Sequence, residues 1–376
     1  MKRSPKPAAT VADLVEAMET VAPANLAQPW DNTGLLAGDP SAACRRILLC
    51  IDLTPPVLAE AMAGACDLVV AYHPLLFKPV SRLSAGAEGP ESILFRAVAA
   101  DLAVYCPHTA LDAAPGGTND VLAGMCGLTE VEPFEYTATG PGQSKVVTFV
   151  PHEQADRVAA AMFAAGAGRI GDYAMCSYRL RGRGTFFGMA GTDPRVGRKG
   201  RLEQVEETRL EVVTPDSRLP EVINALFSAH PYEEPAYDIY PLRPPPGFGI
   251  GRVGMLPAGT TLAGLARRLR RACGNSRVEI VGRPDTAVRR AAVCAGSAGR
   301  LPFEKPRSAD CDVVVTGEMR HHDALALLRN GRSAVLLGHW ESERPVLPVL
   351  AERLRAALRG VRVAVSRKDA SPFARP

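Results

Sequence analysis

The fold is decided first by residues 46–73, whose sequence is RILLCIDLTPPVLAEAMAGACDLVVAYH. Two runs, 46–51 and 68–71, are continuously apolar apart from Arg46 at the start of the first, and they flank a stretch of helical spacing at 56–64. Strands without polar alternation are typical of parallel sheets that are covered on both faces. This stretch therefore predicts a β-α-β unit, in which a helix connects two parallel strands.

The same alternation continues on either side of this unit. An amphipathic helix is predicted at 11–21 with Thr10 as its N-cap, followed later by a helix at 91–100 and a strand at 102–106. The C-terminal part repeats the pattern, with strands predicted at 289–295, 312–316, 333–337 and 361–365 and helices at 262–271, 322–329 and 346–358. Both flanks of the chain therefore predict α/β structure.

The middle of the chain follows a different order. Strands are predicted at 145–150, 178–181, 185–189, 206–213 and 236–240, and helices at 154–165 and 219–230. This split β-α-β order predicts a small ferredoxin-like sandwich. Turn-rich joints bound it at 140–142 and 243–247.

We therefore predict an α/β fold made of two halves that form one domain, interrupted by an inserted ferredoxin-like α+β domain. The first half spans 11–140, the insertion 141–245 and the second half 246–376, after a disordered tail at 1–10. Neither flank by itself has the strands of a complete α/β domain.

Composition excludes several classes of protein. With 47% hydrophobic and 22% charged residues, the 376-residue chain has the balance of a globular protein. It contains no apolar run of the ~20 residues that cross a bilayer, and its basic N-terminus lacks the apolar core of a signal peptide. Its nine cysteines are scattered without a CxxC pair, which argues against disulfides and thiolate zinc sites. We expect a cytoplasmic protein with no membrane partner.

The net charge of +4 is mild for a chain of this length. Arginines cluster at 267–271 and 289–290, but no aromatic residues interleave with them as stacking platforms for bases. A solvated helix face explains these clusters, and we do not expect nucleic acid as a partner.

The candidate functional residues begin with an arrangement that occurs in both flanks. His108 and Asp112 stand four positions apart just past one predicted strand. His339 and Glu343 stand four positions apart just past another. Open α/β sheets bind ligands at the carboxyl ends of their parallel strands, so these side chains are expected at a ligand-binding edge.

Further histidines follow the preceding strand of each flank. His73 comes directly after the run 68–71, and His321 and His322 come shortly after the run 312–316. Taken singly, each histidine is explained by the polar composition of loops at strand ends. The duplicated placement favours a site that these residues build together.

Imidazole and carboxylate ligands together suit a divalent transition metal such as Zn, Mn or Fe. Two carboxylates in such a set can bridge two ions roughly 3.5–4 Å apart, a geometry used to activate water for hydrolysis. The sequence therefore predicts a metal centre built mainly from His73, Asp112, His339 and Glu343.

Two other motifs have alternative interpretations. The loop WDNTG at 30–34 is explained by an Asx-type turn with glycine at a positive φ, or it forms a wall of the same cleft. The loop HPYEE at 230–234 is explained by a proline-flanked turn, or it holds a second metal site.

These residues resemble a known family, the NGG-interacting-factor-like proteins, which are also known as dinuclear-metal hexameric proteins and GTP cyclohydrolase I type 2 homologues. The resemblance rests on WDNTGL at 30–35, YHP at 72–74, HTALD at 108–112, TGE at 316–318 with HH at 321–322, and GH at 338–339 with Glu343, all in family order. The middle segment, which ends in HPYEEP at 230–235, resembles the PII-like or CutA-like domain that longer members carry as an insertion.

The resemblance implies separate roles for the metal ligands. His73 would bind one ion, Asp112 and Glu343 would bridge two, and His339 would bind the second. It also implies a toroidal homohexamer whose metal sites face an inner cavity, with the inserted domains near the openings.

The chain departs from the family at Tyr72. Members commonly have two consecutive histidines where this chain has Tyr72 and His73. Tyrosine is a poorer ligand at neutral pH because the pKa of its phenol is about 10. One of two metal positions would then be weak, empty, or completed by His108 or water, giving one or two ions per subunit.

Two functions remain open from the sequence. The first is a metal-dependent hydrolase with His108 or His321 in proton transfer and a small-molecule substrate, for which the family's cyclohydrolase label makes GTP a candidate. The second is a non-catalytic metal-binding regulator, chaperone or scaffold that senses a ligand through its PII-like insertion.

Overall fold

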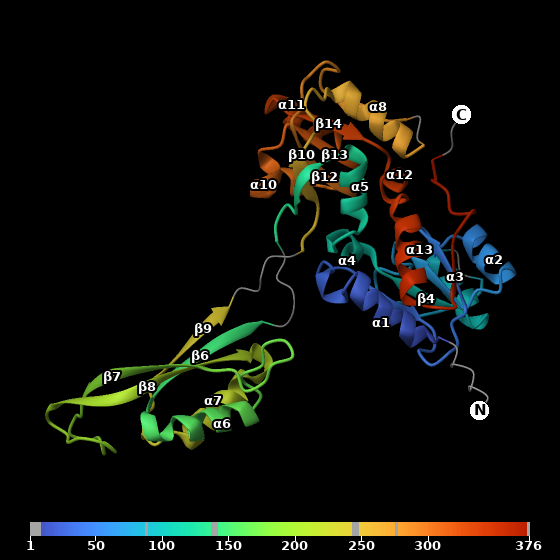
Figure 1. The fold of residues 1–376 in the computed structure, drawn as a ribbon. Helices are drawn as coiled ribbons and strands as arrows, with labels where there is room; N and C mark the ends of the chain where they lie inside the picture. Colours follow the sequence, from blue (N-terminus) through green and yellow to red (C-terminus); the bar gives the residue numbers. More distant parts are fainter. Residues whose placement is uncertain (1–8, 87–88, 137–141, 243–247, 275–276, 374–376) are drawn as a thin grey trace, which may run out of the picture. The chain divides into compact units, whose positions relative to one another are not determined.

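The computed structural model describes residues 9–86, 89–136, 142–242, 248–274 and 277–373, which form two compact units (Figure 1). Unit 1 comprises Met1–Thr137 with Gly247–Pro376, and unit 2 comprises Ala138–Pro246. The predicted boundaries at 140–141 and 245–246 and residues 1–8 of the predicted tail lie outside the described residues. None of the helices formed by the described residues has the length and apolar character that a membrane crossing requires.

Unit 1 contains a five-stranded sheet, called here the first sheet, with the strand order β1-β4-β3-β2-β15. Strands β15, β2, β3 and β4 are parallel, and β1 pairs with β4 in the antiparallel direction. All residues of β3 and β4 are buried, as their continuous apolar runs predict. The strands are β1 (Gly34–Ala37), β2 (Arg46–Cys50), β3 (Leu68–Ala71), β4 (Ala103–Cys106) and β15 (Arg362–Val365).

Helices cover both faces of the first sheet. Helices α1 and α13 share one hydrophobic cluster with the sheet, and α2 and α3 share another. Alternate residues of β2 divide between the two layers, since Ile47 and Leu49 join the first cluster and Leu48 and Cys50 join the second. Thr10 caps α1 as predicted. The helices are α1 (Val11–Val21), α2 (Pro55–Ala63), α3 (Pro90–Ala99) and α13 (Val346–Ala357).

The second sheet of unit 1 has six strands in the order β11-β14-β13-β12-β10-β5. Its central strands β12, β13 and β14 are parallel, and the outer strands are antiparallel to their neighbours. Helices α5 and α8 pack on one face, while α9 and α11 pack on the other. The elements are α5 (Thr118–Cys126), β5 (Thr129–Glu132), β10 (Arg252–Met255), α8 (Leu262–Ala272), β11 (Glu279–Val281), β12 (Arg290–Ser297), α9 (Leu301–Glu304), α10 (Pro306–Ala309), β13 (Val313–Glu318), α11 (His321–Arg329) and β14 (Ser333–Leu336).

Each flank of the chain contributes to both sheets. The C-terminal strand β15 pairs with β2 of the first sheet, whereas α5 and β5 from the first flank belong to the second sheet. The two predicted halves therefore interlock, which the strand pattern alone did not reveal. Unit 1 also contains three short helical elements: η1 (Ala24–Leu26), α4 (His108–Ala113) and α12 (His339–Glu343).

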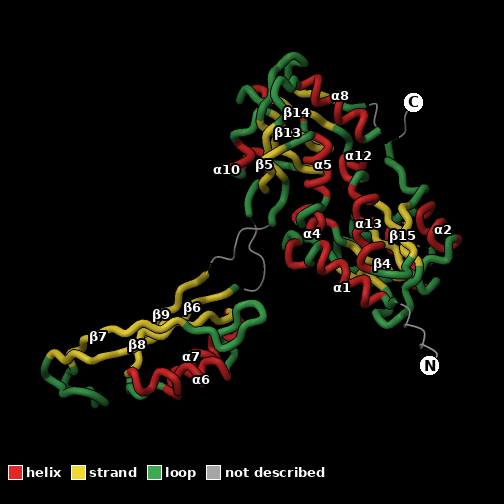
Figure 2. Tube along the Cα trace, viewed as in Figure 1, coloured by secondary structure: helices red, strands yellow, loops and turns green. Residues whose placement is uncertain are grey.

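Unit 2 is a four-stranded antiparallel sheet with α6 and α7 on one side (Figure 2). Its element order and its strand order β7-β8-β6-β9 are those of the β-α-β-β-α-β arrangement. The prediction of separate strands at 178–181 and 185–189 was wrong: they form one strand, β7, because Gly182 and Gly184 stay paired with β8. The elements are β6 (Gln143–Pro151), η2 (His152–Gln154), α6 (Ala155–Ala164), β7 (Tyr178–Phe187), β8 (Leu202–Pro215), η3 (Asp216–Arg218), α7 (Leu219–Ala229) and β9 (Tyr237–Leu242).

Candidate metal centre

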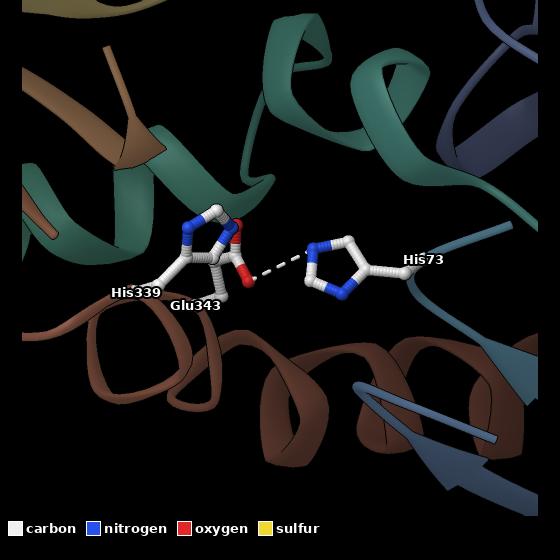
Figure 3. Close-up of side chains that lie close together, drawn as sticks. All are labelled: His73, His339 and Glu343. Atoms are coloured by element: carbon white, nitrogen blue, oxygen red, sulfur yellow. Dashed lines mark ion pairs between the residues drawn. The ribbon is translucent and has the colours of Figure 1, made fainter. Parts of the chain in front are cut away.

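Three predicted ligands meet beyond the carboxyl ends of parallel strands from the two sheets of unit 1. His73 follows β3, while His339 and Glu343 lie on α12, which follows β14. One ligand atom from each of the three residues lies within 4.8 Å of the others. Figure 3 shows His73 facing the carboxylate from one side and His339 beside it on the same helix. We call these three residues the metal triad.

Glu343 is the centre of the metal triad. Its side chain is 5% exposed, and its Oε1 and Oε2 atoms each lie 3.2 Å from the Nε2 atom of a histidine, His339 and His73 respectively. Among the described residues, the His73 Nε2 atom is the one partner that Oε2 has. Burial raises the pKa of Glu343, but the two histidines outweigh burial and hold the pKa below its usual value. The carboxylate is therefore ionised and has a free lone pair that a cation can use.

The two triad histidines are oriented by carboxylates that the sequence analysis did not single out. His73 Nδ1 lies 2.9 Å from Asp52 Oδ1, and His339 Nδ1 lies 3.1 Å from Glu318 Oε1. A carboxylate that fixes Nδ1–H leaves Nε2 as the lone-pair nitrogen, which is the usual support of a histidine that binds a metal. Asp52 could have been identified from the sequence, since it is a carboxylate that directly follows the predicted strand 46–51.

Without a metal, both histidines hold protons strongly. Burial lowers the pKa of His73, but Asp52 and Glu343 outweigh it and raise the pKa to about 10. The contact with Glu343 is the main reason that the pKa of His339 rises to about 9. A cation and two protons therefore compete for the same pair of Nε2 atoms.

The end of β12 closes the triad from one side. Gly296 has φ +63°, and a Cβ atom there would lie 3.1 Å from His339 Nε2 and would also meet Glu343. Its N–H donates to Ser342 Oγ on α12 at 2.8 Å. The glycine thus leaves the space beside the ligand atoms open while its backbone fixes α12.

His108 is held by the loop 30–34, for which two interpretations were open. Its Nδ1 lies 2.7 Å from Asp31 Oδ1, and Asp31 Oδ2 also accepts from the backbone and hydroxyl of Thr109. The His108 ring lies 5.4 Å from the His73 ring, centre to centre, and its φ of +27° is unusual for a side chain other than glycine. The loop therefore lies beside His73 and orients His108, and Gly34 has the positive φ (+102°) that the turn interpretation predicted.

Asp112 lies outside the metal triad. Its carboxylate accepts a hydrogen bond from the hydroxyl of Tyr72, and its carbonyl accepts one from the side chain of Asn119 at 3.0 Å. Burial raises the pKa of Asp112 to about 6 even though the Tyr72 hydrogen bond opposes this rise. Burial also raises the pKa of the Tyr72 phenol well above its usual value, so Tyr72 remains a neutral donor.

The remaining histidine candidates lie apart from the triad contacts. His321 is exposed on the first turn of α11, and its ring contacts His322. At the loop 230–234, both ring nitrogens of His230 contact backbone atoms, with Nε2 3.0 Å from the Phe149 carbonyl and Nδ1 accepting from the Tyr232 N–H. The turn interpretation of that loop accounts for its histidine.

Asp369, near the C-terminus, contacts both the backbone after β2 and a side chain of α12. Its Oδ2 accepts from the Ile51 N–H at 3.0 Å, next to Asp52, and lies 3.4 Å from Nη1 of Arg344. Its Oδ1 accepts from the indole N–H of Trp340 at 3.2 Å. Trp340 lies on α12 and Arg344 directly follows its last residue, so one buried carboxylate positions both the helix and the strand end that orients His73. Sequence spacing carries no signal for this role.

We expect Asp369→Ala to destabilise the chain by about 3 kcal/mol, because it leaves Arg344 half-buried without its partner. Zinc affinity should fall as well, since α12 and the end of β2 lose their common support. Chemical unfolding and zinc titration measure the two effects. The exposed neighbour Lys368→Ala is the control. Unchanged zinc affinity in a folded Asp369→Ala protein would rule out the positioning role.

Known proteins resemble this chain over nearly its whole length. The family model Duf34/NIF3 (NGG1p interacting factor 3) matches residues 9–372. A Mycobacterium tuberculosis protein named GTP cyclohydrolase 1 type 2 homolog is 37% identical over 351 residues, or 92% of this chain and 91% of the relative. A Bacillus subtilis protein of the same name is 34% identical over 365 residues, or 96% and 97% of the two chains.

Solved structures agree with this assignment. A Bacillus cereus protein related to NIF3 has a TM-score of 0.68 at 33% identity, covering 99% of this chain and 100% of that one. The Staphylococcus aureus protein SA1388 has a TM-score of 0.81 at 23% identity, covering 98% and 99%, and shares the fold. The chain therefore belongs to the Duf34/NIF3 family.

Proposed function

We propose that this chain is a metal-dependent hydrolase whose metal centre is built around Glu343. The observation that carries the proposal is the buried carboxylate of Glu343, whose two oxygen atoms each face one histidine Nε2 atom at 3.2 Å. Both histidines have their Nδ1 atoms paired with carboxylates. This donor set fits Zn, Mn or Fe.

The proposed roles follow from these contacts. His73, His339 and Glu343 would hold the cation, and Asp112 would join them as the predicted second carboxylate. A divalent cation held there supplies Lewis acidity, which polarises a substrate for attack by water. His108, oriented by Asp31, is the proposed proton-transfer group, and exposed His321 is the alternative.

The names of the relatives make GTP the first substrate to test. We expect zinc- or manganese-loaded protein to release formate from GTP, and Asp112→Ala to lower this rate at least about tenfold, the lower end of the loss expected when a residue that supports a metal site is removed. Formate is measured enzymatically, with metal-free protein as the blank. If Asp112→Ala releases formate as fast as the wild type, the assignment fails.

The second candidate is a metal-binding regulator, chaperone or scaffold, with unit 2 as a PII-like sensor of a ligand. The hydrogen bond from the neutral Tyr72 hydroxyl to Asp112 favours this candidate, because a catalytic centre would need the Asp112 carboxylate free to bind metal. Tightly held metal in a protein without turnover on GTP or a broad panel of hydrolase substrates would support it.

Tyr72→His should raise the metal content from one to two ions per chain. The imidazole would replace a phenol whose raised pKa makes it a poor ligand, and it would release Asp112 from its present hydrogen bond. Metal analysis of dialysed protein measures the ratio. Tyr72→Phe is the control, since it frees Asp112 without adding a ligand. Two ions in the wild type, or one in Tyr72→His, would contradict this expectation.

We also propose that the chain assembles as a toroidal homohexamer, as its family resemblance implies. Sedimentation equilibrium of the full chain measures this directly, and a monomer at all concentrations would reject it.

A further inference from the structure

Two large aromatic side chains near the metal triad are exposed to solvent. Trp30, in the loop at 30–34, is 62% exposed, and Phe77, in the loop that follows His73, is 53% exposed. Single exposed apolar side chains are ordinary on a protein surface. These two meet at one place, because the ring of each lies 5.9 Å from the ring of His108, centre to centre. We call Trp30 and Phe77 the aromatic pair.

The backbone on both sides of the aromatic pair is held in place. Asn32 Nδ2 donates to the carbonyl of Leu76 at 2.6 Å, which joins the loop of one ring to the loop of the other. Asp31, next to the first ring, has a buried side chain that lies 2.7 Å from His108 Nδ1. Exposed rings on a fixed backbone lose little freedom when a ligand covers them, so less of the binding free energy is spent on ordering.

The two rings of the aromatic pair do not cover each other. Their planes meet the plane of the His108 ring at 74° and 77°, in the edge-to-face manner. Among the ring contacts of the described residues, none joins Trp30 to Phe77. More than half of the surface of each residue therefore remains open to a ligand. The partner that gains most from such surfaces is another flat ring, because aromatic contacts stabilise beyond the area that they bury.

One imidazole ring separates the aromatic pair from the metal triad. The His108 ring, which both members of the pair contact, lies 5.4 Å from the His73 ring, centre to centre. On its other side, His73 Nε2 faces the Glu343 carboxylate at 3.2 Å. A ligand with a polar group at the triad therefore reaches the aromatic pair by extending across His108.

We propose that the aromatic pair binds a flat ring of the substrate while a polar group of the same molecule lies at the metal triad. This inference rests on the metal centre of the proposed function and deepens it by naming the class of substrate. That class is a molecule with an aromatic or heteroaromatic ring at or beside the group that water attacks. Trp30 and Phe77 determine specificity in this arrangement and take no part in proton transfer.

The test measures binding to the zinc-loaded full chain by calorimetry, so it does not depend on turnover. Its three probes share the zinc-binding hydroxamate group: acetohydroxamate, cyclohexanecarbohydroxamate and benzohydroxamate. The flat benzohydroxamate should bind at least about tenfold more tightly than acetohydroxamate and more tightly than the saturated ring of similar size. Trp30→Ala and Phe77→Ala should each weaken benzohydroxamate at least about fivefold, as expected for a lost stacking partner, and leave acetohydroxamate unchanged. Trp30→Phe should keep most of the preference for the flat ring.

Phe373→Ala is the matched control, because Phe373 is 72% exposed in the same unit and should change no affinity. Zinc content, which reports on the metal triad, should stay the same in every variant. The proposal is overturned if the wild type binds the flat and the saturated ring equally, if acetohydroxamate is weakened as much as benzohydroxamate, or if no hydroxamate binds. Formate release from GTP is measured separately. Turnover without a ring preference rejects this inference alone, and a ring preference without turnover rejects the hydrolase alone.

Discussion

Glu343→Gln should lower the affinity for Zn²⁺ by more than about 100-fold, since changes to residues that merely support a ligand already cost 10–100-fold. Gln has nearly the same shape as Glu, so the fold of α12 should be retained. The amide has no charge, and one of its two ends presents N–H donors toward a histidine Nε2 atom. The two 3.2 Å contacts that define the metal triad cannot both survive this change.

Chelator competition on the purified protein measures this loss, and metal analysis after dialysis gives an independent value. Glu341→Gln is the matched control, because Glu341 lies on the same helix and outside the triad. Zinc affinity that stays within a few-fold of the wild type in Glu343→Gln would show that the triad is not the metal centre.

The second large effect is a steep pH dependence of metal binding. Because the pKa values of His73 and His339 in the metal-free chain are about 10 and about 9, both residues are protonated at neutral pH. Binding at their Nε2 atoms releases two protons, so affinity should rise about 100-fold for each pH unit below pH 9. Between pH 9 and 10 the affinity should rise only about tenfold per pH unit, and above pH 10 it should no longer change with pH.

Competition titrations at several pH values between about 6 and 8 measure this slope. His73→Gln should reduce it to about tenfold per pH unit, because one titrating ligand is gone. His322→Gln is the control, since His322 is exposed on α11 and should leave the slope at its wild-type value. A wild-type slope near zero would mean that the metal binds elsewhere.

The same pKa shifts predict how the stability of the metal-free protein changes with pH. The folded pKa values of His73 and His339 lie above their ordinary value of 6.5, so their stabilisation is complete below pH 6.5 and is lost as pH rises through 9 and 10. The pKa of Glu343 lies below its ordinary value of 4.5, so its contribution is present above pH 4.5 and lost in acid. The combined contribution of these three residues to stability should therefore be greatest between about pH 4.5 and pH 6.5.

Much of the site was predictable because the sequence features that indicate it lie within a few neighbouring residues. An apolar run predicts a buried parallel strand, and a polar residue just beyond it is placed at the ligand-binding edge. This reasoning named His73, His339 and Glu343, which the structure brings together. It also placed His108 close to His73.

The sequence by itself indicated most strands, most helices and the three residues that meet in the triad, because these depend on the spacing of neighbouring residues. Only the tertiary structure decided that β15 completes the first sheet and that the Tyr72 hydroxyl donates a hydrogen bond to the Asp112 carboxylate. It also brought Asp369 to Ile51, a residue 318 positions away in the chain. Such pairings follow from how the sheets interlock and which buried polar groups find partners, and no local period encodes that.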